Sequence, residues 1–219
     1  MPNWIATNLY IRGSKDNLQK VMDNLLVTDE WRKQVEERNA KVSPKMVVNG
    51  KAIGTQMVKF FKISCDKERF PNGTLDFNRI IPTPLNVFQG SVGTKEEKRY
   101  GNMNCWYDWN IENWGCKWNA SDCSMEILDD NTLYLIMWTP WSFPDPLMDK
   151  FCKLCAGYEC TIDGEFADDD FGGVMGTFQT DEDDPERSLQ ILWDSENKEL
   201  YENVWGEGSL DPIDDEEEM

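Results

Sequence analysis

Residues 124–163 read SMEILDDNTLYLIMWTPWSFPDPLMDKFCKLCAGYECTID, and this stretch decides the fold because it changes its apolar spacing twice. Its first half holds two short runs rich in apolar residues, 124–129 and 132–139. Asp130-Asn131 separates the two runs, and a pair of this kind between strand-like runs is typical of a β-hairpin. The first half therefore predicts two antiparallel strands.

The second half of the stretch predicts a helix followed by a strand. Between residues 147 and 156 the apolar side chains recur at helical spacing, and Gly157 follows as a stop signal. Residues 158–163 alternate again, and residues 172–179 form a further strand-like run. This part of the chain thus predicts the order strand, strand, helix, strand, strand.

The amino-terminal residues add one more strand and one more helix. Residues 3–12 alternate with one slip, and Gly13 breaks the pattern. Ser14 is an N-cap residue type, and apolar residues recur at helical spacing over residues 18–26. The sequence predicts an α+β fold in which helices cover one face of an antiparallel sheet.

Between these two parts lies a predicted Trp-rich helical insertion at about residues 57–120. The Trp spacing within residues 105–118 predicts a short helix that ends at Gly115. Pro82 and Pro84 predict an extended segment, and residues 88–103 read as a flexible connection.

Two regions follow from this pattern. Residues 1–180 are expected to form the α+β domain with its insertion. Residues 181–219 are expected to form an acidic extension that is partly docked, with a disordered tail from residue 211 onward.

Composition excludes several classes of protein. The 219 residues include ten Trp, ten Phe and no His, which removes every catalytic or metal site that needs imidazole. A mean hydropathy of -0.62 and the lack of a long apolar run argue against a membrane span. No signal peptide, phosphate-binding loop, dinucleotide fingerprint or nucleophile elbow is visible, so we expect a cytoplasmic protein in a bacterial host cell, without a cofactor.

Charge is the strongest signal in the composition. The net charge is -19, and residues 159–219 hold 22 acidic and 2 basic residues. Such a surface repels nucleic acid and anionic membranes and attracts basic protein surfaces. We therefore expect a basic host protein or nucleoprotein complex as the partner. The simpler explanation of the negative charge is that it keeps the protein soluble. The sequence leaves the oligomeric state open.

Seven cysteines in a chain without an export signal are expected to be reduced thiols. Cys152 and Cys155, followed by Cys160, have spacing that a zinc site also uses. They fall on core-facing positions, where free Cys is commonly a small buried apolar residue. We expect structural thiols rather than a metal site.

Three consecutive carboxylates, Asp168, Asp169 and Asp170, follow the predicted strand at 158–163. They could gather Ca²⁺ or Mg²⁺ or supply a general acid and base. Adjacent residues in a strand point to opposite faces, and the spacing is not that of an EF-hand. We therefore expect these three residues to form a solvated turn that holds no metal and contains no catalytic residue.

Four segments together resemble the YubB ferredoxin-like family of phage- and plasmid-encoded proteins. They are Met1-Pro2-Asn3-Trp4; Asp76-Phe77-Asn78-Arg79-Ile80-Ile81-Pro82; Trp106-Tyr107-Asp108-Trp109 with Asn113-Trp114-Gly115 and Lys117-Trp118-Asn119; and Phe166-Ala167-Asp168-Asp169-Asp170 with Gly172 and Gly176. The resemblance spans roughly residues 1–180 and departs from the family at Cys116. It implies a ferredoxin-like fold and an origin on a bacterial mobile element, and it implies no activity.

The function expected from these features is inhibition by mimicry of nucleic acid. Ordered carboxylates can imitate a phosphate backbone and occupy the basic groove of a bacterial defence nuclease complex, as an anti-CRISPR or anti-restriction protein would. The predicted acidic surface is Asp168, Asp169, Asp170, Asp181, Glu182, Asp183, Asp184 and Glu186. The predicted aromatic anchors are Trp193, Tyr201 and Trp205.

The alternative is a small enzyme, or a module that binds a nucleotide or sugar, at the Trp-rich segment. Its candidate residues are Trp106, Asp108, Trp109, Trp114, Lys117 and Trp118. Packing of these rings as a core plug is the competing interpretation, and the acidic surroundings disfavour nucleic acid there.

Overall fold

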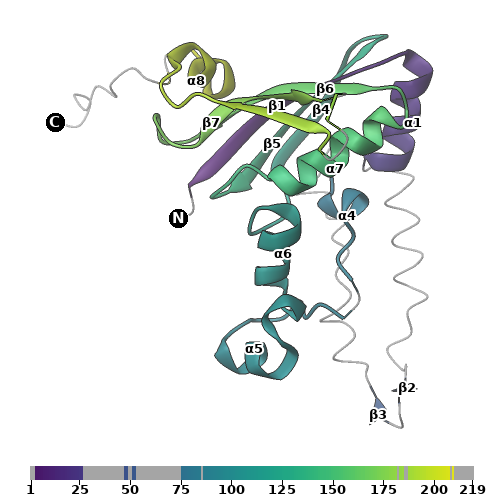
Figure 1. Cartoon of the computed structure of the whole chain (residues 1–219), viewed down its shortest axis with the longest axis vertical. Coiled ribbons are helices and arrows are strands. Elements are labelled where there is room, and N and C mark those ends of the chain that lie inside the picture. Colours follow the sequence, from purple (N-terminus) through teal and green to yellow (C-terminus); the bar gives the residue numbers. More distant parts are fainter. Residues whose placement is uncertain are drawn as a thin grey trace, which may run out of the picture.

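A six-stranded antiparallel sheet is the centre of the computed structural model (Figure 1). The structure describes residues 3–26, 47–48, 51–52, 75–84, 86–181, 183–184, 187–207 and 209. The strand order is β4-β5-β1-β6-β7-β8, and every neighbouring pair runs antiparallel. The strands are β1 (Trp4–Arg12), β4 (Ser121–Asp129), β5 (Thr132–Pro140), β6 (Thr161–Asp168), β7 (Met175–Thr180) and β8 (Leu189–Trp193). Two short strands, β2 (Val47–Val48) and β3 (Lys51–Ala52), pair separately.

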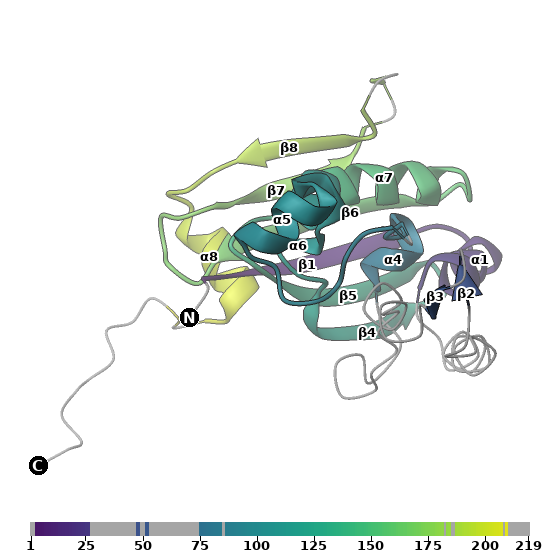
Figure 2. The same cartoon turned by 90° about the horizontal axis from the view of Figure 1, so that it is seen from below.

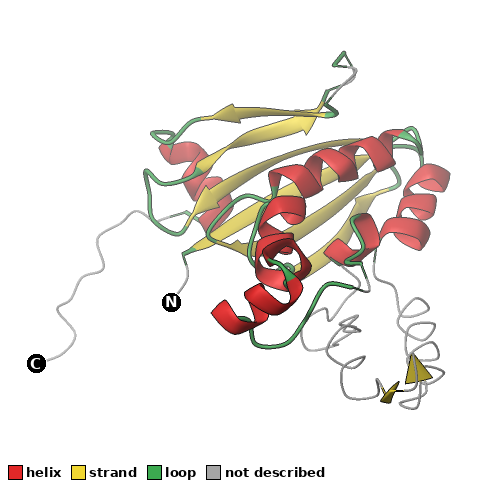
Figure 3. Cartoon of the chain, turned by 60° about the horizontal axis from the view of Figure 1, so that its bottom comes forward, coloured by secondary structure: helices red, strands yellow, loops and turns green. Residues whose placement is uncertain are grey.

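The order in which the chain visits this sheet is that of a ferredoxin-like fold. The elements β1, α1 (Lys15–Leu25), β4, β5, α7 (Asp145–Ala156) and β6 form two interleaved strand–helix–strand units. Helices α1 and α7 cover one face of the sheet (Figures 1 and 3). The predicted α+β, ferredoxin-like class is thus confirmed, and β7 and β8 extend the sheet beyond β6.

Local sequence signals explain where these elements begin and end. Ser14 caps α1 by accepting a hydrogen bond from the backbone N–H of Asn17, at 3.3 Å. In β1 the side chains at Ile5, Leu9 and Ile11 face the helices and are fully buried. The alternation in the sequence therefore maps directly onto the two faces of the central strand.

The core between the sheet and helices α1 and α7 includes a cluster of three phenylalanines. The rings of Phe143 and Phe166 stack at 4.2 Å, and Phe178 lies 5.1 Å from Phe143. Cys152 and Cys155 of α7 are fully buried in the same core, and Cys160 joins it. The cysteines are therefore core side chains in this structure.

Helix α8 (Lys198–Trp205) lies on the opposite face of the sheet from α1 and α7, which the sequence analysis did not anticipate (Figure 1). Leu200 and Tyr201 of α8 pack against Ala167 and Met175 of the sheet. β8 pairs with β7, so the sheet domain does not end at residue 180 but continues through α8. The predicted tail from residue 211 lies outside the described residues.

The insertion between α1 and β4 is helical over its described part. It holds α4 (Phe77–Ile80), α5 (Thr94–Tyr100), the 3-10 helix η1 (Asn102–Asn104) and α6 (Trp106–Trp114). Figure 2 shows α5 and α6 on the same side of the sheet as α7. Gly115 ends α6 in the left-handed conformation, as predicted. The expectation that the segment before Pro82 extends is wrong, because α4 forms there, but Ile81 is extended in front of Pro82, as the prolines predict. The expected flexible connection at 88–103 instead contains α5 and η1.

Candidate functional site

The carboxylates predicted to form one surface are divided between the two ends of β7. Asp168, Asp169 and Asp170 lie at the end of β6, before β7 begins. Asp181 and its neighbours lie after β7, at the turn toward β8. Six extended residues separate the groups, which is about 20 Å. The prediction of one continuous patch is therefore wrong; Glu182 and Glu186 lie outside the described residues.

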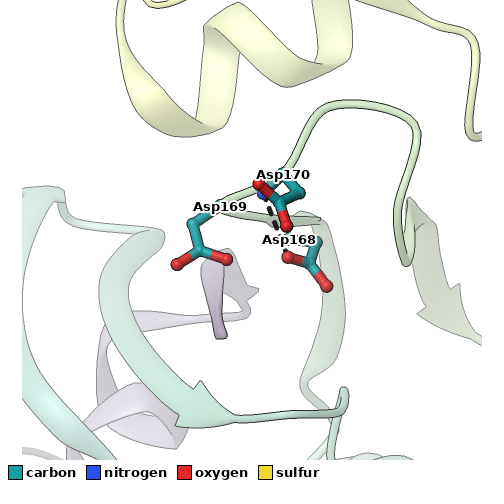
Figure 4. Close-up of side chains that lie close together, drawn as sticks. All are labelled: Asp168, Asp169 and Asp170. Atoms are coloured by element: carbon teal, nitrogen blue, oxygen red, sulfur yellow. Dashed lines mark hydrogen bonds between the residues drawn. The ribbon is translucent and has the colours of Figure 1, made fainter. Parts of the chain in front are cut away.

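Asp168 organises the acidic loop 168–170 (Figure 4). Its Oδ1 accepts the backbone N–H of Asp170 at 3.0 Å and the side-chain amide of Asn3 at 3.4 Å. Asn3 Nδ2 also donates to Asp170 Oδ2 at 3.2 Å. Burial raises the pKa of the Asp168 carboxyl above its ordinary value. These bonds account for the conformation of the loop as a turn.

The same three carboxylates are close enough to one another to share a cation. One oxygen from each lies within 4.8 Å of the others, and this is the place in the described part of the chain where three potential metal ligands meet. Asp169 and Asp170 are exposed, and exposed acidic turns commonly exist without a metal. We derive no metal chemistry from the loop.

Helix α8 holds the backbone of this loop. The Tyr201 hydroxyl donates to the carbonyl of Asp169, and the Trp205 indole N–H donates to the carbonyl of Asp168, both at 2.9 Å. Tyr201 is only 6% exposed, and Trp205 packs against Trp138 at 5.2 Å. Tyr201 and Trp205 are therefore structural here, which corrects their prediction as partner anchors.

Trp193 differs from these two rings because it remains accessible. It lies on β8 and is 60% exposed, with one edge against Phe166 at 5.3 Å. Of the three predicted anchors, it is the one whose ring can meet a partner.

The predicted aromatic ligand site is mostly packed into the core. Trp109 and Trp114 are buried and meet edge to face at 5.5 Å. The Trp114 indole N–H donates to the carbonyl of Ile81, and that of Trp106 donates to the carbonyl of Gly90. These three tryptophans therefore anchor the insertion instead of offering a stacking surface.

Lys117 and Trp118 form a separate, more accessible group. The Lys117 ammonium lies 4.4 Å from the centre of the Trp118 ring and 4.2 Å from that of Trp141. Trp141 is 45% exposed and has a φ of 73°, an uncommon conformation for a residue with a side chain. Asp108 lies half-buried on α6 and is not part of this group. Sequence reasoning missed Trp141.

A pocket that the sequence analysis did not anticipate opens on the sheet face beside α8. Its volume is about 560 Å³. We call it the open-face pocket, and it is lined by Asn8, Tyr10, Tyr134, Asp163, Gly164, Glu165, Thr177, Phe178, Gln179, Gln190, Leu192 and Asn203. Carboxylates, amides and two tyrosines thus converge in one concave site, which is more polar than the mostly apolar pockets that usually hold small molecules.

An arginine outside the lining of the open-face pocket is paired with one of its carboxylates. Arg12 Nε and Nη2 donate to the two carboxylate oxygens of Asp163 at 2.7 and 3.1 Å. The guanidinium also lies 5.2 Å from the centre of the Tyr10 ring. Tyr10 stacks on Tyr134 at 4.9 Å, so the two rings form one wall. The hydrogen bond to Asp163 raises the pKa of Arg12 above its ordinary value.

The other carboxylate of the pocket, Glu165, has weaker support. It lies opposite Asn8 in the β1–β6 register and accepts a long hydrogen bond of 3.5 Å from Asn203 Nδ2. Burial raises the pKa of Glu165 above its ordinary value; the Asn203 bond opposes this rise, and the nearby Glu199 carboxylate adds to it. Glu165 is thus a partly desolvated acid with little compensation.

The thiols offer no reactive group in this site. The six described cysteines are buried, and burial raises the pKa of Cys152 to about 12. A thiol with such a pKa is protonated at neutral pH and is a poor nucleophile. None of the described helices is long and apolar enough to cross a membrane.

These observations define a ferredoxin-like α+β protein with a polar pocket on the open face of its sheet. Residues 113–207 match the model of a family described as the ferredoxin-like domain in Api92-like protein. The matched segment runs from the end of α6 through α8, so it includes the β7–β8 extension and α8.

Among solved structures, the crystal structure of the protein api92 from Yersinia pseudotuberculosis is similar at 13% sequence identity and a TM-score of 0.48. That comparison covers 88% of this chain and 98% of the other. None of the curated proteins matches this chain. Membership of the YubB group and an origin on a mobile element go beyond these matches.

Proposed function

We propose that this protein is a non-catalytic binding protein that docks onto a basic partner protein through one acidic face. We define this acidic face as Asp163, Glu165, Asp169, Asp170, Glu199 and Glu202; the buried Asp168 holds the turn that presents Asp169 and Asp170. It combines β6, the loop 168–170 and α8, which the Tyr201 and Trp205 hydrogen bonds hold together. The observation that carries the proposal is this ordered clustering of carboxylates in a chain of net charge -19.

The proposal includes the kind of groove that the acidic face fits. Asp163 and Glu165 are two residues apart on β6, so both point to the open side of the sheet, where Asp163 is paired with Arg12. The exposed Asp169 and Asp170 follow at the end of the strand, beyond Ala167, which α8 covers. Carboxylates fixed in a row on a folded surface present negative charge as backbone phosphates do. A protein groove built for nucleic acid is the complementary surface, and ion release on docking would favour binding.

The proposal extends to a biological setting through the resemblance to the YubB group. A phage or plasmid benefits from blocking a bacterial nuclease complex, whose grooves are basic. We therefore propose an anti-CRISPR or anti-restriction role, in which this chain competes with the nucleic acid of such a complex. Leu192, which is 62% exposed on the edge strand β8 and lines the open-face pocket, supplies an apolar contact for the partner, whereas Trp193 points to the helix-covered side of the sheet.

The test uses two variants with equal net charge. One carries Asp168→Asn, Asp169→Asn and Asp170→Asn on the acidic face, and its control carries Asp181→Asn, Asp183→Asn and Asp184→Asn at the far end of β7. The tagged full chain captures partners from a bacterial lysate at ~50 and ~200 mM salt. The captured partner is then purified and challenged with duplex DNA.

The expected result is a partner that binds at the lower salt, is lost at the higher salt and is displaced by DNA. The variant at residues 168–170 should lose it, and the control should retain it. Equal capture by both variants, or no competition from DNA, would overturn the proposal.

The alternative function, a small-ligand module, now rests on Lys117, Trp118 and Trp141, the accessible part of the aromatic segment. Stacking of a planar ligand on these rings would be nearly insensitive to salt, whereas docking through the acidic face would weaken steeply. Trp118→Ala and Trp141→Ala abolish binding only if this alternative holds.

A further inference from the structure

We infer that the open-face pocket is a subsite for one arginine side chain of the partner, with Glu165 as its carboxylate. This inference rests on the proposed function, because it assumes a basic protein docked on the acidic face. It adds a defined contact point and a side-chain preference, neither of which net charge alone provides.

The first support is an arginine that the sheet already binds. The Arg12 guanidinium is held by two hydrogen bonds to the Asp163 carboxylate and lies over the Tyr10 ring. A planar cation between a carboxylate and an aromatic face is a favourable combination, because the charge and the ring quadrupole both act on it. This face of the sheet therefore has the chemistry that a guanidinium needs.

The second support is another carboxylate beside the same tyrosine rings, which has no cation paired with it. Glu165 lies two residues along β6 from Asp163, on the same side, and lines the pocket together with Tyr10 and Tyr134. Among the described residues, no ion pair involves Glu165, and its carboxylate accepts the 3.5 Å hydrogen bond from Asn203 Nδ2. Glu199 adds a second negative charge near it. A cation placed here would compensate both acids.

The third support is the set of amide oxygens around Glu165. Asn8 uses its Nδ2 to donate to the carbonyl of Asn203, and Gln179 uses its Nε2 to donate to Gln190 Oε1. Their own side-chain oxygens remain as acceptors, and a guanidinium has five N–H groups to donate. The lining thus offers acceptors beyond the carboxylate.

Two other ligand classes fit the pocket less well. A neutral polyol would leave the Glu165 carboxylate desolvated without a charge to offset it. A hard cation prefers several carboxylate oxygens together, and the described residues bring three such ligands together at 168–170 instead. An arginine satisfies the charge, the planar wall and the amides at once.

The experiment compares three capped pentapeptides: Gly-Gly-Arg-Gly-Gly, the same peptide with lysine in place of arginine, and the same peptide with citrulline, which is planar but neutral. Each is titrated into the full chain at ~50 mM salt. Binding is followed by NMR through the side-chain amide signals of Asn8, Asn203 and Gln179. The variant is Glu165→Gln, and Glu196→Gln, an exposed residue outside the pocket, is the control of equal charge. The backbone NMR spectrum of each variant verifies folding.

We expect saturable binding of the arginine peptide with a Kd on the order of 1 mM, which corresponds to about 4 kcal/mol. The citrulline peptide should bind at least tenfold more weakly. Glu165→Gln should reduce arginine binding by the same factor, and Glu196→Gln should leave it unchanged.

Equal binding of the arginine and citrulline peptides, or of the arginine peptide to both variants, overturns the inference. A lysine peptide that binds as well as the arginine peptide also overturns it, because charge alone would then suffice. These results are independent of the partner capture described above. Loss of capture in the variant at residues 168–170 together with a failed peptide titration would keep the acidic-face function and remove this subsite.

Discussion

Replacing Gly164 by alanine is expected to destabilise the protein, because this glycine is covered on the core side of β6. A Cβ at this position would lie 2.3 Å from the backbone oxygen of Asn8 and 2.6 Å from Cζ of Phe178. The register explains both contacts: Gly164 pairs with Leu9 on β1 and with Phe178 on β7. The nearer obstacle is backbone of the central strand, so a rotamer change cannot relieve it.

The size of the effect follows from two opposing contributions. Overpacking of this kind costs about 1–3 kcal/mol, and a backbone obstacle places Gly164→Ala near the upper value. Alanine recovers about 0.5–1 kcal/mol, because glycine loses more chain entropy on folding. The net loss is about 2 kcal/mol, which for a chain of this size lowers the melting temperature by about 4–8 °C.

Thermal unfolding followed by circular dichroism measures this loss. The matched control is Gly93→Ala, whose new Cβ would meet its nearest neighbour, Glu96, at an ordinary 3.6 Å. Gly93 precedes α5 as its N-cap, so the control should lose less than about 1 kcal/mol. If the two variants melt alike, Phe178 does not lie across Gly164, and the β1–β6–β7 register described above is wrong.

Three further predictions concern α8, the buried acids and the thiols. Tyr201→Phe removes the hydroxyl that donates a hydrogen bond to the backbone carbonyl of Asp169. We expect the free energy of unfolding in denaturant to fall by about 1 kcal/mol and amide exchange to become faster in α8 alone. Unchanged exchange in α8 would contradict the role given to this hydroxyl. Burial raises the pKa of Asp168 and Glu165 in the folded protein, so the folded state binds more protons than the unfolded state. The free energy of unfolding should therefore increase as the pH falls from 7 through these raised pKa values toward about 4. Asp168→Asn and Glu165→Gln should each flatten that curve in a pH series of urea titrations, and a parallel shift at every pH would refute the assignment. Cys152 and Cys155 should resist alkylation by iodoacetamide at pH 8 in the folded protein and react after denaturation. Mass spectrometry maps the labelled thiols. Labelling of both cysteines in the native state would show that α7 is not packed as described.

The elements that the sequence predicts well are those whose signals are local. The alternation of β1, the Ser14 cap of α1 and the stop of α6 at Gly115 depend on residues within one turn or strand. The β4–β5 hairpin also depends on neighbouring residues alone. These features could be derived because the chain itself brings the determining residues together.

The short helix α4 shows what local patterns miss. Prolines at 82 and 84 predict an extended segment, but Asp76 caps a single helical turn before them by accepting the N–H of Asn78 at 2.9 Å. Asn119, far away in the sequence, donates to the same carboxylate at 2.6 Å. A tertiary contact thus fixes a turn that propensity alone does not predict.

The open-face pocket could not have been located from the sequence. Tyr10, Tyr134 and Glu165 lie on three different strands, and each strand pattern predicts only that these side chains share the polar side. The strand order β5-β1-β6 and its register bring them together. The same reasoning explains the divided carboxylates, because runs close in sequence are separated once β7 extends between them.

The central position of β1 has a consequence for the synthesis of this protein. β1 lies between β5 and β6, so it has neither neighbour until residues 132–140 and 161–168 have been made. At about 5–20 residues per second, this apolar strand leaves the ribosome about 10–30 s before its second neighbour. The apolar side of β1 is therefore uncovered by its sheet neighbours during that interval, and a separate peptide of residues 3–26 should be able to complete a chain that lacks them.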